Sequence, residues 1–280
     1  MCRNTRLPKS TVSKEISRLE KHFKTKLLER SSRNIYITEP GNIVYPRALQ
    51  VLDELKALNE DVQTMEDHVQ GLINITAPPV MGEILSKSVI PEFLKQWPRA
   101  SIHLNLSYSF EDLFAENYDL ALRVGQIHDD RLVCRQIGVS TRYLVASKEY
   151  IQNFGNPSTP EELPKHNCLR FQFRHDFSEW PLTREGETKV INVHGNFFCS
   201  NIHALKQLAL QGGGIAQLPI SAIKDDLIQR KLVRVLPNWD IPTNPIYAMY
   251  RSGLNKTKKL QAILDFLDKK QHIFEQYFLP

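Results

Sequence analysis

The chain has 280 residues, of which 41% are hydrophobic and 24% are charged, as in a globular protein with about two domains. No stretch approaches the ~20 consecutive apolar residues of a transmembrane helix, and no apolar secretion signal opens the chain, so we expect a cytoplasmic protein. The formal net charge is +5: residues 1–40 hold ten Lys or Arg and four Glu, whereas the other 240 residues hold 26 basic and 27 acidic side chains. This asymmetry predicts either a polyanionic partner for the N-terminal segment or a solvated basic helix face.

The residue types of common catalytic and metal sites are scattered. The four cysteines have no zinc or redox spacing, so we expect reduced thiols and no metal or other cofactor, with a thiol sensor at Cys168 or Cys199 as an alternative that spacing does not support. Neither Gly-x-Ser-x-Gly nor His-Glu-x-x-His occurs, and His128 and His175 lie in polar stretches. We therefore expect that the protein is not an enzyme.

Residues 9–23 are predicted to form an amphipathic helix. Its apolar residues recur at intervals of four, three and four, as one stripe of a helix requires. The stripe consists of Val12, Ile16, Leu19 and Phe23. The opposite face carries small hydroxyls and cations, namely Ser10, Lys14, Ser17, Arg18 and Lys21. Small hydroxyls allow close approach to base edges, and cations neutralise phosphates, so this face is typical of a DNA-reading helix.

Residues 26–38 are predicted to form a hairpin that leads into another helix. Two short strands, expected at 26–30 and 35–38, flank a polar turn, and Arg30 and Arg33 at the tip suit a DNA backbone or minor groove. Thr38 and Glu39 then provide an N-cap and an acidic first turn for the next helix.

Three segments in order, 8–20, 27–30 and 37–41, resemble the LysR-type transcriptional regulators. The family pattern is a recognition helix with a Val-Ser-(Arg/Lys)-x-Ile-x-x-Leu-Glu core, a Leu-(Phe/Leu)-x-Arg step and a Thr-x-x-Gly after the wing, and this chain matches all three. The resemblance implies a winged helix-turn-helix whose base-reading positions are Lys9, Ser10, Ser13 and Lys14. It places Thr11, Ser17 and Arg33 near phosphates.

The resemblance also implies roughly twenty residues before this point, which form the first helix and most of the second in the family. Residues 1–40 therefore predict a partial winged helix-turn-helix, in which Val12, Ile16 and Leu19 lack much of their packing partner. Two explanations follow. Either the start is misassigned, or the chain is a shortened regulator that dimerises and binds ligand without binding DNA.

Residues 41–70 are predicted to form a long linker helix that ends at Gly71. Apolar residues recur at spacings of three and four, as in a coiled-coil seam: Ala48, Leu52, Leu55, Leu58, Val62, Met65 and Val69. The alternative is packing against the helix's own domain. Pro46 predicts a kink near Tyr45. The resemblance implies dimerisation through this helix, which suits palindromic half-sites.

Residues 71–280 alternate between apolar strands and amphipathic helices, which predicts an α/β fold with parallel sheets. The expected strands are 72–76, 102–106, 119–124, 143–146, 190–198, 215–218, 232–235 and 246–250. The expected helices are 83–97, 110–117, 147–153, 202–211, 220–229 and 256–274. The resemblance implies a two-lobed effector domain like the type 2 periplasmic binding proteins, with lobe I at 72–145 and 246–280 and lobe II at 146–245.

Effectors in such folds bind at the carboxyl ends of strands and at helix N-termini. These positions select Pro79, Val80, Ser107, Arg123, Ser200, Asn201 and Leu218 as effector-binding candidates. Arg123 suits a carboxylate or, equally, a structural partner, and Ser107 and Ser200 are also candidate N-caps. The glycines at 212–214 follow a helix and precede a strand, which favours a helix C-terminal cap over a phosphate loop.

Together these patterns predict a transcription regulator that binds double-stranded DNA as a homodimer or dimer of dimers. A small-molecule effector between the lobes would control it, and RNA polymerase is a further expected partner. The rival hypotheses are an enzyme, a periplasmic-type binding protein, which would need a secretion signal, and the shortened regulator described above.

Overall fold

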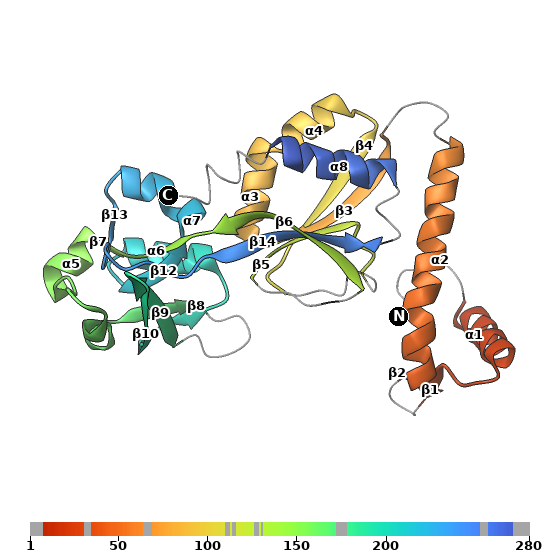
Figure 1. Cartoon of the computed structure of the whole chain (residues 1–280), viewed down its shortest axis with the longest axis horizontal. Helices are drawn as coiled ribbons and strands as arrows, with labels where there is room; N and C mark the ends of the chain where they lie inside the picture. The colour runs from red at the N-terminus through yellow and green to blue at the C-terminus, as the bar shows by residue number, and fades with distance from the viewer. Residues whose placement is uncertain are drawn as a thin grey trace. The chain divides into compact units, whose positions relative to one another are not determined.

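The computed structural model describes residues 8–30, 35–63, 69–109, 113, 116–125, 129, 131–171, 178–252 and 257–270. These residues divide into two compact units, Met1–Asn59 and Glu60–Pro280 (Figure 1). Each unit is described by itself below.

The first unit contains the predicted helix, hairpin and long helix. α1 spans Lys9–Phe23, β1 Leu28–Arg30, β2 Ile35–Ile37 and α2 Glu39–Gln63. β1 and β2 pair antiparallel, with Leu28 opposite Ile37. α1 ends where Lys24 adopts a left-handed conformation with φ of 54°. α2 continues through Pro46, and the kink near Tyr45 stays a prediction.

The second unit contains two sheets, each five-stranded in the described part of the chain. The first has the order β4-β3-β5-β14-β6, with bounds Ala100–Leu106, Gly71–Ala77, Leu120–Val124, Asn244–Arg251 and Leu132–Ser140. The second has the order β11-β8-β12-β7-β13, with bounds Phe198–Cys199, Cys168–Phe171, Ile215–Pro219, Arg142–Ser147 and Leu232–Arg234. β9 (Glu179–Arg184) and β10 (Glu187–Asn192) form a separate hairpin.

The prediction of parallel sheets is wrong, because both sheets are mixed. β3 runs parallel to β4 and β5, but β14 runs antiparallel to β5 and β6. β12 runs parallel to β8 and antiparallel to β7. The cause lies in β6 and β14, which carry the chain between the two sheets in opposite directions (Figure 1). Strands that cross in opposite directions can lie side by side only as an antiparallel pair.

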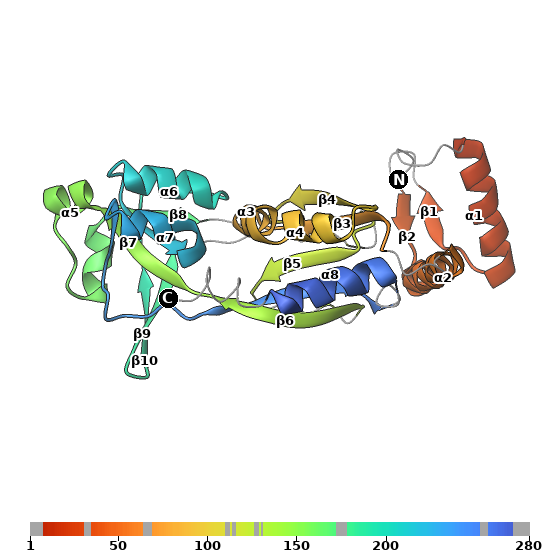
Figure 2. The same cartoon turned by 90° about the horizontal axis from the view of Figure 1, so that it is seen from above.

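Helices cover the sheets. The first sheet carries α3 (Pro79–Ser88), α4 (Ile90–Gln96) and α8 (Lys258–Lys269). The second carries α5 (Lys148–Phe154), the 3-10 helix Pro160–Lys165, α6 (Ile202–Leu210) and α7 (Ile220–Ile228). Figure 2 shows the two groups of helices at opposite ends of this unit. No helix among the described residues is long and apolar enough to span a membrane.

Other expectations differ in detail from the structure. The single helix expected at 83–97 is two helices, because Pro91 has no N–H for a hydrogen bond to the preceding turn. The strand expected at 190–198 is divided between β10 and β11. β6, β8 and β9 were not predicted, and most of the expected helix at 110–117 lies outside the described residues. The helix C-cap at Gly212 is confirmed by its φ of 77° and its N–H bond to the Ala209 carbonyl (3.2 Å).

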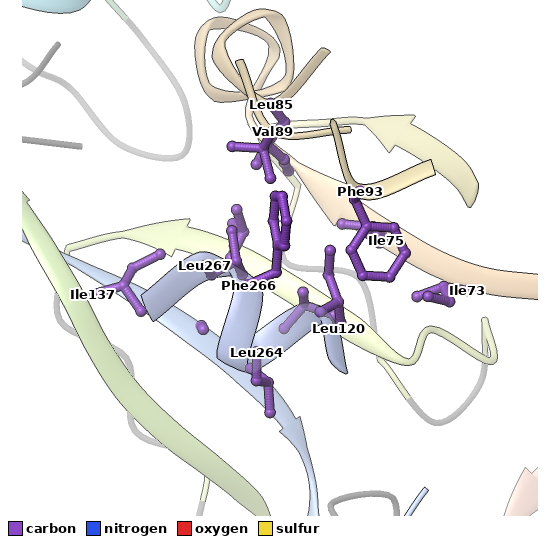
Figure 3. Close-up of a cluster of buried hydrophobic side chains, with 14 of the residues drawn as sticks. Ile73, Ile75, Leu85, Val89, Phe93, Leu120, Ile137, Leu264, Phe266 and Leu267 are labelled. Carbon is purple, nitrogen blue, oxygen red and sulfur yellow. The ribbon is translucent and has the colours of Figure 1, made fainter. Parts of the chain in front are cut away.

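The core of the first sheet lies under α3, α4 and α8 (Figure 3). Phe93 of α4 is fully buried and packs edge-to-face against Phe266 of α8, with ring centroids 5.6 Å apart. Burying one such aromatic side chain contributes roughly 2–3 kcal/mol, so this contact joins the C-terminal helix firmly to the sheet. The core therefore gives the first sheet a rigid base from which β6 and β14 project.

Candidate DNA interface and interlobe cavity

The polar face of α1 is exposed in the first unit. Ser10, Thr11, Lys14 and Ser17 are exposed, and Ser13 is half-buried. Lys9 is the first helical residue, but its side chain and all of Arg33 lie outside the described residues. The structure thus presents most of the predicted DNA-binding side chains on one helix, although their contacts with DNA stay a prediction.

Glu20 connects α1 to the hairpin. Its carboxylate accepts hydrogen bonds from the backbone N–H groups of Leu27 (2.9 Å) and Leu28 (3.2 Å), and Lys26 Nζ lies 3.3 Å away. The hydrogen bonds from Leu27 and Leu28, with the help of Lys26, hold the pKa of Glu20 below its ordinary value. The carboxylate therefore fixes the start of the wing against the end of α1.

Thr38 and Gly41 connect the other side of the hairpin to α2. The Thr38 hydroxyl donates to the Lys26 carbonyl (2.6 Å) and accepts from the Gly41 N–H (3.1 Å), which confirms Thr38 as a helix cap. A Cβ at Gly41 would lie 2.3 Å from the Leu27 carbonyl oxygen, so the close approach of α2 to the hairpin requires glycine.

An apolar stripe on α2 faces solvent in this unit. Val51, Leu52, Leu55 and Leu58 are each more than half exposed. Met65 lies outside the described residues, as does the side chain of Val62, while Val69 packs against the core of the first sheet. Large apolar side chains in such a row are typical of a helix that pairs with a partner.

A cavity of about 270 Å³ lies between the two lobes of the second unit. From the first sheet and α3 it is lined by Pro78, Val80, Met81, Tyr108, Arg123 and Val124. From the second sheet, its helices and the β9–β10 hairpin it is lined by Phe171, Trp180, Ile202, Gln217, Pro219 and Ser221. Ser140, Arg142 and Asn244 line it where the chain crosses between the lobes.

Two of the seven predicted effector residues, Val80 and Arg123, line this cavity. The Arg123 guanidinium already donates to the Leu122 carbonyl (2.9 Å), the Thr76 hydroxyl (2.9 Å) and the Ser109 carbonyl (3.0 Å). These contacts support the structural role that the sequence left open for Arg123.

The other five predicted residues lie outside the lining. Pro79 opens α3, and Leu218 is fully buried in the core of the second sheet. The Ser107 hydroxyl accepts from the Ser109 N–H (3.0 Å), and Ser200 is exposed. Asn201 caps α6, accepting from the backbone N–H groups of residues 203 (2.8 Å) and 204 (3.1 Å). Asn201 rather than Ser200 is therefore the N-cap, and contact of these five residues with an effector stays a prediction.

Arg142 is the cavity residue that the sequence analysis missed. Its Nη1 donates to Gln217 Oε1 (3.1 Å), while its Nε is enclosed without a hydrogen-bond partner. Gln217 Nε2 and the Ser221 hydroxyl are likewise enclosed and unpartnered. Burial lowers the pKa of Arg142. Only its position at the start of a strand could have drawn attention to it, and that signal is weak.

The two lobes contact each other around the cavity. Val80 of α3 belongs to the hydrophobic cluster of the second sheet, and Tyr108 packs edge-to-face against Phe171 with centroids 5.1 Å apart. Burial raises the pKa of the Tyr108 hydroxyl to about 12, so it stays protonated. His203 Nε2 of α6 lies 3.1 Å from Glu83 Oε1 of α3. These contacts bring the lobes together over the apolar part of the lining.

The family model of the LysR substrate binding domain matches residues 66–271, and that of the bacterial regulatory helix-turn-helix protein, lysR family, matches residues 2–42. The chain is similar to an uncharacterized HTH-type transcriptional regulator of Haemophilus influenzae, with 31% identity over 252 residues, which cover 90% of this chain and 88% of that protein.

Two full-length solved structures are also similar. The virulence activator AphB of Vibrio cholerae, a member of the LTTR family, has a TM-score of 0.66 and 28% identity, covering 94% of this chain and 90% of that one. CrgA, a LysR-type regulator from Neisseria meningitidis, has a TM-score of 0.67 and 28% identity, covering 95% and 90%. The match of residues 2–42 to the helix-turn-helix model favours a regulator that binds DNA over the alternative of a shortened regulator that does not bind DNA. The chain belongs to the LysR-type family of transcriptional regulators, with a helix-turn-helix segment and an effector-binding domain.

Proposed function

We propose that this regulator binds operator DNA as a homodimer or dimer of dimers, with the exposed face of α1 in the major groove. The observation that carries the proposal is the row of exposed hydroxyls and Lys14 on that face, within a segment that holds ten of the chain's basic residues. Hydroxyl and amine donors of this kind contact bases and phosphates. The exposed apolar stripe on α2 supports pairing of two copies.

The proposed control is a small molecule in the interlobe cavity. Its binding changes lobe closure, which changes the spacing of the DNA-binding segments in the dimer and hence DNA bending or contact with RNA polymerase. We propose that the protein performs this role in the cytoplasm and catalyses no reaction. In support, none of the described residues that line the cavity is a His, Cys, Asp or Glu.

The test is a gel-shift titration on the DNA upstream of the protein's own gene, with a scrambled duplex as competitor. Lys14→Ala is expected to weaken operator binding by roughly 1–3 kcal/mol, because Lys14 is placed to contact a base. Lys165→Ala, which removes an exposed lysine from the second unit, is the matched control and is expected to bind like wild type.

Unchanged affinity of Lys14→Ala for both operator and scrambled DNA would contradict the base-reading role. If the wild-type chain forms no salt-sensitive complex with the operator, the DNA-binding function itself fails, since phosphate contacts make such complexes weaken as salt rises.

A further inference from the structure

The cavity lining carries positive charge without a compensating acid. Two arginines line it, and no Asp or Glu among the described residues does. Arg123 directs its guanidinium to oxygens of the first lobe. Arg142 has no carboxylate partner among the described residues, and the amide oxygen of Gln217 is a neutral acceptor. The two arginines differ in their donors, because the Nε of Arg142 is enclosed with no hydrogen-bond partner among the described residues.

Three enclosed polar groups that line this part of the cavity have no hydrogen-bond partner among the described residues. They are Arg142 Nε, Gln217 Nε2 and the Ser221 hydroxyl. Arg142 lies opposite Pro219 in the pairing of β7 with β12, so Gln217, two residues earlier on β12, projects from the same face. Ser221 follows in the first turn of α7, where the helix dipole also favours negative charge. All three groups can donate hydrogen bonds.

An anion at this position would satisfy the donors. A buried donor left unsatisfied is costly, and a guanidinium pairs best with a planar, two-oxygen acceptor such as a carboxylate. The rest of the lining is apolar and contains Val80, Met81, Phe171, Trp180 and Ile202. At about 30 Å³ per water molecule, 270 Å³ holds roughly nine waters, or a ligand of about ten non-hydrogen atoms.

We propose that the effector is a small monocarboxylate with an apolar body, whose carboxylate is bound by Arg142, Gln217 and Ser221. This inference rests on the proposed effector role of the cavity and adds the chemical class of the ligand and the residues that select it. Phe171 and Trp180 contact the apolar body, and Arg142 supplies the charge that distinguishes an acid from its neutral analogue.

The test compares acids with amides of the same shape. Benzoate and hexanoate are titrated into the full chain by calorimetry, with benzamide and hexanamide as neutral probes. Wild type is expected to bind at least one acid about tenfold or more tightly than its amide, because a charged hydrogen-bonded pair forms only with the acid. Arg142→Gln is expected to abolish that preference, while Arg184→Gln, at the exposed end of β9, is expected to retain it.

A second variant guards against misfolding of Arg142→Gln. Gln217→Glu places a carboxylate of the protein beside Arg142, with nearly unchanged shape. We expect this internal anion to raise the Tm of the second unit and to abolish acid binding. If either Arg142→Gln or Gln217→Glu still binds the acid more tightly than its amide, the assignment of these residues as the carboxylate site is wrong.

Wild-type protein that binds neither acid, or binds acid and amide equally, also overturns the ligand class. The gel shift with wild type and no added ligand separates that failure from failure of the proposed function. A normal operator complex together with no acid binding leaves the regulator role intact and eliminates only the carboxylate.

Discussion

Glu20 shows how a single side chain can determine the geometry of the DNA-binding unit. Its two backbone hydrogen bonds, to Leu27 and Leu28, span the junction between α1 and the wing. A carboxylate oxygen accepts such bonds more strongly than a neutral amide does. The charge of Glu20, and not only its shape, is therefore expected to stabilise this junction.

Replacing Glu20 by Gln tests this expectation. Because the folded-state pKa of Glu20 lies below its ordinary value of about 4.5, the charge of Glu20 stabilises the unit above that pH, and this stabilisation is lost as pH falls through the folded-state pKa. Glu20→Gln is expected to lower the Tm of the first unit at pH 7, with a difference that shrinks as pH falls below about 4.5. Thermal unfolding followed by circular dichroism at several pH values measures it.

Glu15→Gln is the control for that experiment. Glu15 also lies on α1, but it is exposed and its closest ion-pair distance is 3.9 Å, to Arg18. Exposed pairs of this kind contribute little to stability. If Glu20→Gln and Glu15→Gln lower the Tm by the same amount, the hydrogen bonds of Glu20 to the hairpin have no specific stabilising role.

The two cavity arginines show what a sequence can and cannot predict about a site. Arg123 was predicted from its position at the end of a strand, and it does line the cavity. Its donors, however, are used by Thr76 and Ser109, which approach it only in the folded chain. Arg142 keeps an unpartnered Nε because no acid in the described part of the chain pairs with it. Which arginine has donors to spare depends on tertiary neighbours, and periodicity carries no information about them.

At the scale of elements, α2 exposes a row of large apolar side chains that a partner could cover. Leu55 is 51% exposed within a row of exposed apolar side chains. Pairing of two such rows removes each leucine from water, which contributes roughly 1.5–3 kcal/mol per side chain. The exposed row therefore supports the proposed pairing of two copies through α2.

Leu55→Lys is expected to shift the protein from dimer toward monomer, because two lysines then face each other in the seam. Light scattering after size-exclusion chromatography measures the mass across a dilution series. Ile228→Lys removes an even more exposed apolar side chain (71%) from α7 and is expected to keep the wild-type mass. A dimer that survives in Leu55→Lys at every dilution would exclude this seam.

The sequence predicted the presence of most helices and strands better than it predicted whether neighbouring strands run parallel or antiparallel. The periods of 3.6 and 2 residues indicated α1, α6 and α7 close to their observed bounds, whereas the helix expected at 41–70 corresponds to α2 at Glu39–Gln63, and residues 69 and 70 are not helical. They could not show that β14 returns beside β6, because alternation of side chains is the same in parallel and antiparallel strands. β6 escaped notice because most of its side chains are only partly buried or exposed, and its apolar pattern is weak.

At the scale of the whole second unit, a small set of contacts joins the lobes. The contact of His203 Nε2 with Glu83 Oε1 is one of them, and the packing of Tyr108 against Phe171 is another. The two-lobed plan was expected from the alternation of strands and helices and from the resemblance. The contacts between lobes were not, because they join residues that are distant in sequence.

His203→Gln removes the side-chain contact between His203 of α6 and Glu83 of α3. Such partly exposed pairs contribute about 0.2–1 kcal/mol, so opening of the lobes is expected to become roughly 1.5- to 5-fold more frequent. Hydrogen exchange of the backbone amides of α6 and α3, followed by mass spectrometry, reports this opening. The change should appear in both helices together.

Glu92→Gln provides the comparison. Glu92 pairs with Lys270 (2.6 Å) within the first lobe, and it is as exposed as Glu83. Its loss is expected to leave exchange in α6 unaltered. If His203→Gln and Glu92→Gln increase the rate of amide hydrogen exchange in α6 equally, the contact between His203 and Glu83 does not specifically hold the lobes together.

The polar end of the cavity lies where the chain crosses between the two sheets of the second unit. Ser140 ends β6, Arg142 begins β7 and Asn244 begins β14, and Ser140 and Asn244 are paired across the two crossing strands. A ligand in the cavity would therefore contact the backbone segments that connect the lobes as well as the side chains of each lobe. This placement gives a small molecule direct access to the only strands among the described residues whose rotation, as proposed, could alter the angle between the lobes.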